Sequence, residues 1–80
     1  MRNEKLIGLR QAAGLTQAQV AARAQIDIRT YRRYELGEIA LGDVAGRRLL
    51  QMAELFGVTV DYLLNGAEIK EREIQKGTEE

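Results

Sequence analysis

The sequence predicts an all-α domain of five short helices, and three observations lead to that prediction. The chain of 80 residues contains no proline, the residue that most strongly interrupts helices. Apolar residues recur at spacings of three and four, which is the helical period, and few β-branched residues cluster. Glycines and capping side chains divide the chain into segments of helix length. A chain this short forms one small domain with a modest core.

The first helix is predicted from Asn3, a capping residue, to about Ala13. Leu6, Leu9 and Ala13 share the inward face by their spacing, and Gly14 ends the helix.

A second helix follows from Thr16 to about Ala24. Thr16 and Gln19 have the three-residue spacing of a capping box, in which each side chain bonds to the other residue's backbone N–H. Its inward residues are Val20, Ala21 and Ala24.

The third helix is predicted over residues 28–36, capped by Asp27 and ended by Gly37. Its inward residues are Tyr31, Tyr34 and Glu35. The outward residues follow from the i,i+4 spacing and are Ile28, Arg29, Arg32 and Arg33. Taken alone, three outward arginines also suit a solvated helix face.

The stretch 37–42 is predicted as a loop, because it lies between two glycines. Asp43 can then cap a fourth helix that runs to Phe56 and is closed by Gly57, and Thr59 can cap a short fifth helix. The apolar residues of these two helices are Val44, Leu49, Leu50, Met52, Ala53, Phe56, Val60, Leu63 and Leu64. We expect the domain to occupy residues 1–66, followed by a charged extension, helical or frayed, over residues 67–80.

The second and third helices are separated by a turn of about three residues, the spacing of a helix-turn-helix. Such a turn makes the two helices cross at a steep angle, so a small residue is needed at the crossing, and Ala21 fits that need. An ordinary helical hairpin explains the spacing equally well.

The net charge of zero conceals a gradient along the chain. Residues 1–50 contain nine Lys or Arg and five Asp or Glu, whereas residues 51–80 contain three and seven. A partner meets the local potential, because salt screens charges beyond about 10 Å. A basic body of this kind can bind a nucleic acid.

The chain has no Cys and no His, which removes thiolate metal sites and nucleophiles activated by His. With no phosphate-binding glycine motif and no paired inward carboxylates, we expect no enzyme activity, no metal and no cofactor. No apolar run reaches the roughly 20 residues of a membrane span, and the N-terminus has no signal-peptide core. We therefore expect a cytoplasmic protein that does not enter membranes.

The stretch "LTQAQVAARAQIDIRTYRRYELG" and the later "QMAELFGVTVDYLLNG" resemble the lambdoid-phage repressor and Cro family of DNA-binding domains, also called the xenobiotic-response-element type. The resemblance covers residues 5–66. The matching positions are Gly14, Leu15, Thr16, Gln17, Val20, Ala21, Ile26, Glu35 and Gly37. One departure is Gln25, where the family usually has glycine; a left-handed Gln there would cost about 1 kcal/mol.

The resemblance implies a compact five-helix domain whose helix 28–36 enters the major groove of double-stranded DNA. Ile28 and Arg29 would then read bases, Arg32 would read a base or hold a phosphate, and Arg33 would hold a phosphate. The remaining expected DNA contacts are Thr30, Thr16 and Gln17, the last at the phosphate backbone. The resemblance also implies a structural ion pair between Arg10 and Glu35.

The resemblance therefore implies a sequence-specific transcription regulator, which we expect to be a repressor that binds operator half-sites as a homodimer. The alternative is an antitoxin or protein-interaction module of the same fold, which would meet a toxin or antirepressor partner through its C-terminal tail. Loss of DNA binding on changing Arg29 and Arg32 would favour the first interpretation.

Overall fold

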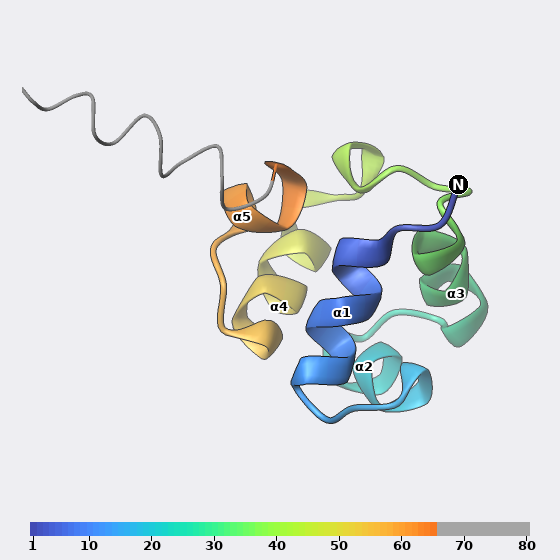
Figure 1. The fold of residues 1–80 in the computed structure, drawn as a ribbon, viewed down its shortest axis with the longest axis vertical. Helices are drawn as coiled ribbons and strands as arrows, with labels where there is room; N and C mark the ends of the chain where they lie inside the picture. The colour runs from blue at the N-terminus through green and yellow to red at the C-terminus, as the bar shows by residue number, and fades with distance from the viewer. Residues whose placement is uncertain (66–80) are drawn as a thin grey trace, which may run out of the picture.

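The predicted all-α architecture is confirmed by a computed structural model that describes residues 1–65 (Figure 1). The elements are α1 (Glu4–Ala12), α2 (Gln17–Ala24), α3 (Ile28–Leu36), a 3-10 turn (Leu41–Asp43), α4 (Gly46–Phe56) and α5 (Val60–Asn65). The predicted extension 67–80, and the protein partner assigned to it, lie outside the described residues.

The helices begin at capping side chains that satisfy the free backbone N–H groups of the first turn. The side-chain oxygen of Asn3 accepts a hydrogen bond from the Leu6 N–H at 3.0 Å. Thr16 and Gln19 form both halves of the predicted capping box. Asp27 accepts hydrogen bonds from two backbone N–H groups at the start of α3. The three predicted starts are therefore confirmed.

The start of α4 differs from the prediction. Asp43 does not cap it; the helix begins at Gly46, and Ala45 at the cap position makes no side-chain hydrogen bond. The preceding residues form a 3-10 turn instead, because that turn buries the side chains of Leu41 and Val44. At the next junction the prediction holds, since the hydroxyl of Thr59 accepts a hydrogen bond from a backbone N–H in α5.

Four helices are each followed by a residue in the left-handed backbone conformation. Gly14, Gly37 and Gly57 have φ values of 73°, 78° and 72°, and glycine adopts this conformation without steric cost. At the end of α2 the same place is held by Gln25, with φ 59° and ψ 45°. The Ile26 N–H then bonds back to a carbonyl of α2, which closes the turn.

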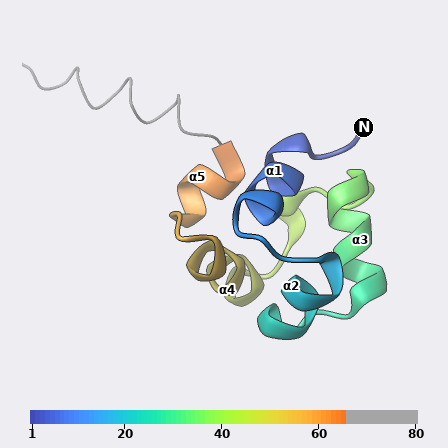
Figure 2. The same ribbon diagram turned by 60° about the horizontal axis from the view of Figure 1, so that its bottom comes forward.

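The helices pack so that α3 lies against both α1 and α2, while α4 joins α2 to α5 (Figure 2). Ala21 is 3% exposed and lies in the core with both tyrosines of α3. This is the small side chain that the sequence predicted for the crossing of α2 with α3. Ile7 is buried in place of the predicted Ala13, which is exposed. The predicted Leu50 is half exposed. The core residues are Leu6, Val20, Ala21, Ala24, Ile26, Tyr31, Tyr34, Leu41, Val44, Leu49, Met52, Ala53 and Leu63.

Candidate nucleic-acid interface

Helix α3 presents two faces of opposite character. Tyr31 and Tyr34 are buried, and their rings meet edge to face with centroids 6.2 Å apart. The other face carries the side chains of Arg29, Arg32 and Arg33, all of them exposed. Because the tyrosines fix the rotation of the helix, the arginines project from a rigid support.

Ile28, predicted to face outward, and Thr30, an expected DNA contact, are less exposed than the arginines. Ile28 is half-buried, because its side chain also packs against the core at the start of α3. Thr30 is also half-buried. Both residues keep part of their surface in solvent, so the outward face of α3 begins with one partly exposed apolar side chain, Ile28, and is cationic beyond it.

A buried carboxylate, Glu35, joins α3 to α1 and α2. Its side chain is paired with Arg10, whose Nε lies 2.6 Å from Oε2 and whose Nη2 lies 3.3 Å from Oε1. The Tyr31 hydroxyl donates to Oε2 at 2.5 Å, and Nε2 of Gln17 donates to Oε1 at 2.9 Å. The carboxylate therefore accepts hydrogen bonds from three side chains, on three helices.

These contacts set the ionisation of the group. Burial disfavours the charged carboxylate, but the hydrogen bonds from Arg10, Tyr31 and Gln17 outweigh it, so the pKa of Glu35 lies below its ordinary value. The hydrogen bond from the guanidinium to Glu35 raises the pKa of Arg10. Burial, and then the hydrogen bond to the carboxylate, raise the pKa of Tyr31. The network is therefore ionised at Arg10 and Glu35 and neutral at the phenol at pH 7.

Gln17 connects this network to the exposed face. Its side chain is half-buried, and its Oε1 accepts a hydrogen bond from Nε of Arg32 at 3.4 Å. The sequence indicated a phosphate contact for this residue and gave no signal of the link to Arg32. The hydroxyl of the neighbouring Thr16 already accepts the N–H of Gln19 in the capping box, but the side of Thr16 that faces solvent stays open.

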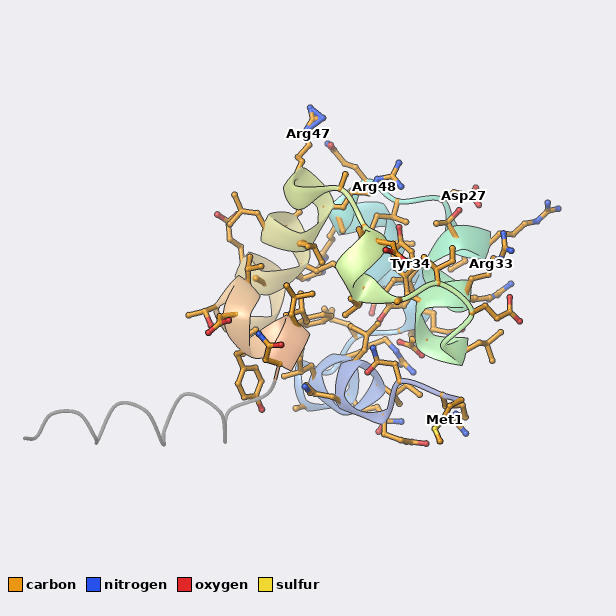
Figure 3. All side chains as sticks on the ribbon, turned by 90° about the horizontal axis from the view of Figure 1, so that it is seen from above. Met1, Asp27, Arg33, Tyr34, Arg47 and Arg48 are labelled. Carbon is orange, nitrogen blue, oxygen red and sulfur yellow. The ribbon has the colours of Figure 1, made fainter. Side chains whose placement is uncertain are left out.

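The other cations near α3 have different surroundings (Figure 3). Arg33 is paired with Glu38, with Nε 3.3 Å from Oε1, and both side chains are largely exposed. At the start of α4, Arg48 Nη1 lies 3.5 Å from the Tyr34 hydroxyl, whereas Arg47 extends away from the body. Part of the positive charge of Arg33 is thus compensated.

The chain's first residues hold the far end of α3. The Asn3 N–H donates to the Glu35 carbonyl at 2.9 Å. Met1 lies so close to Gly37 that a side chain there would collide with its backbone, as a Cβ would come 1.6 Å from the Met1 oxygen. A cavity of about 320 Å³ remains beside this contact, lined by Arg2, Ile7, Gln17, Arg32, Glu35 and Leu36.

The arrangement can bind an extended polyanion. Its guanidinium groups are hydrogen-bond donors on one helix face, and Arg is the side chain best suited to bidentate recognition of phosphate or a guanine edge. Among residues 1–65, no cluster of His, Cys, Asp or Glu that could hold a metal ion is present. Within the same range, no helix is long and apolar enough to span a bilayer.

Comparison with known proteins gives one match. A family model described as helix-turn-helix matches residues 6–63, which include all of α2 and α3 and most of the described chain. No curated protein and no solved structure shows significant similarity to the chain.

Proposed function

The chain belongs to the helix-turn-helix family of the phage-repressor and Cro type, a family of DNA-binding regulators, and on that premise we propose that it represses transcription by binding specific operators. In this proposal α3 lies in the major groove of double-stranded DNA. The observation that carries the proposal is the exposed face of α3, where three arginines project from a helix whose opposite face is fixed in the core. A groove of B-form DNA about 12 Å wide admits one such helix.

The exposed side chains divide into two roles. Arg29, near the helix N-terminus, reads a base edge, and the exposed part of Ile28 contacts a thymine methyl group. Thr30 adds a hydroxyl contact beside them. Arg33, whose charge is shared with Glu38, binds a phosphate at the edge of the groove.

The start of α2 supports the same orientation. Thr16 and Gln17 lie at a helix N-terminus, where backbone N–H groups and the helix dipole favour a phosphate. Phosphate contacts of this kind fix the position of the protein on the duplex without reading sequence. They hold α3 in register with the bases.

We further propose that the protein binds as a homodimer. Two-fold related copies would place their α3 helices in successive major grooves, about 34 Å apart, and would read a palindromic operator. The exposed Leu64 of α5 is available for such a contact. A bound dimer would repress by covering the promoter.

Selection of binding sites from a random DNA library, at two salt concentrations, tests this function. We expect an enriched palindromic sequence, with an affinity that falls steeply as salt rises because bound counterions are released. Arg29→Ala should weaken the selected site by about 1–3 kcal/mol and relax preference at one base pair. A library that shows no enrichment at either salt concentration would refute the proposal.

A further inference from the structure

We propose that Gln17 is a positioning residue, which holds Arg32 so that its two terminal Nη groups read one guanine. The inference rests on the proposed function and assigns to the same interface a base preference that the structure can explain. It also gives Gln17 a role beyond a phosphate contact, because its amide lies between the buried carboxylate and the exposed arginine.

The orientation of the Gln17 amide is set by chemistry. The ionised Glu35 carboxylate can only accept hydrogen bonds, so the amide NH₂ group must face it, and Nε2 lies 2.9 Å from Oε1. The amide oxygen therefore faces the other way. Glu35 itself cannot turn, because Arg10 and Tyr31 hold its second oxygen at 2.6 and 2.5 Å.

The amide oxygen in turn contacts the inner nitrogen of Arg32. Nε of Arg32 donates to Oε1 of Gln17 in a long hydrogen bond of 3.4 Å, so the edge of the guanidinium that contains Nε is occupied. The end of the group, with Nη1 and Nη2, stays available. Two parallel donors match the O6 and N7 acceptors of guanine, whereas adenine offers a donor beside its N7.

The neighbouring arginines do not share this support. Nε of Arg33 is paired with Glu38, on the surface rather than with the core. Within residues 1–65 the hydrogen bond of Arg29 is made by its backbone N–H and not by its side chain, so the position of the side chain is less restricted before DNA arrives. Arg32 is the arginine of α3 that is connected through Gln17 and Glu35 to α1.

The first test uses chemically altered DNA. In the duplex obtained by selection, each guanine is replaced in turn by 7-deazaguanine, which lacks the N7 acceptor. At one position per half-site the wild-type protein should lose about tenfold or more in affinity, and Arg32→Ala should show no further loss there. If Arg32→Ala remains sensitive at every guanine, the guanine assignment is wrong.

The second test removes the support. Gln17→Met keeps the length of the side chain without its hydrogen bonds, and Gln11→Met, at an exposed position of α1, is the matched control. We expect Gln17→Met to lose affinity several-fold for the selected duplex and to discriminate less against 7-deazaguanine. In the Arg32→Ala background the same change should no longer alter discrimination against 7-deazaguanine, and the loss that remains, from the phosphate contact, should be equal on selected and random duplexes. In the wild-type background, a loss that is equal on selected and random duplexes would instead identify a phosphate contact alone and overturn the inference.

A third measurement needs no DNA and separates this inference from the proposed function. In proton–nitrogen spectra of the free protein, the Nε–H signal of Arg32 should shift and exchange faster with water in Gln17→Met, while that of Arg29 stays unchanged. An unchanged Arg32 signal contradicts the inference even if the protein binds DNA. Failure to enrich any duplex, with the Arg32 signal shifted as expected, would instead locate the failure in the proposed function.

Discussion

Replacing Gln25 with glycine should stabilise the protein. Gln25 is the one residue other than glycine with positive φ within residues 1–65, and the three other left-handed helix ends are glycines. The left-handed conformation costs an L-residue about 1–2 kcal/mol. Glycine removes that cost but makes the unfolded chain more flexible, which offsets about 0.4–1 kcal/mol. The expected net gain is therefore about 1 kcal/mol.

The side chain of Gln25 contributes little to this balance. It is exposed, and its Oε1 accepts a single hydrogen bond from Gln51 Nε2 at 3.5 Å, the long limit for such a bond. The backbone bonds that close the turn, from the N–H groups of Gln25 and Ile26, do not depend on the side chain. Gln25→Ala is the matched control, because it removes the side-chain bond and keeps the backbone cost.

Urea and thermal unfolding followed by circular dichroism measure the effect. For a domain of this size, 1 kcal/mol raises the melting temperature by about 4–8 °C, so Gln25→Gly should melt that much higher, and Gln25→Ala should melt at or below the wild-type temperature. An unchanged or lower melting temperature for Gln25→Gly would refute the reasoning. An equal gain for Gln25→Ala would show that the side chain, and not the backbone, is responsible.

Three further predictions concern the supports of α3. Glu35→Gln should lower the free energy of unfolding by about 1–3 kcal/mol in urea titrations, because it removes the charged partner of the partly buried Arg10 and weakens the hydrogen bonds to it; a loss below 1 kcal/mol would contradict this. The pKa of Glu35 is lowered by folding, so its contribution to stability is complete above about pH 4.5, the ordinary value, and disappears as pH falls through the lower folded-state pKa. In urea titrations at a series of pH values, the free energy of unfolding of wild type should therefore fall more steeply below about pH 4.5 than that of Glu35→Gln, and equal slopes would contradict this. Ala21→Leu should destabilise by about 1–3 kcal/mol through overpacking where α2 crosses α3, whereas Ala22→Leu on the exposed face of α2 should not, and equal effects would locate the crossing elsewhere.

Much of the fold could be predicted because it is decided by local chemistry. Asn3, Thr16 and Asp27 cap helices by hydrogen bonds to backbone atoms two or three residues away, so their spacing in the sequence is sufficient. Gly37 and Gly57 end helices for an equally local reason, the cost of positive φ. The two faces of α3 follow from helical periodicity.

The remainder depends on contacts between distant parts of the chain. Asp43 has a capping side chain, but burial of Leu41 and Val44 places it in a 3-10 turn, and that burial is decided by the whole core. The link between Gln17 and Glu35 joins residues 18 positions apart, and its geometry depends on the crossing of α2 with α3. The pair of Arg10 with Glu35 was expected from the family resemblance, since periodicity alone does not bring these two residues together.

The central claim is that the outward face of α3 contacts DNA. The most direct test is to titrate nitrogen-15-labelled protein with the selected duplex and to monitor its N–H signals by nuclear magnetic resonance. We predict the largest shifts in residues 28–33, in the arginine Nε–H signals of α3 and in the backbone N–H groups of Thr16 and Gln17. Shifts confined to α4 and α5, with the signals of α3 unchanged at saturation, would contradict the claim.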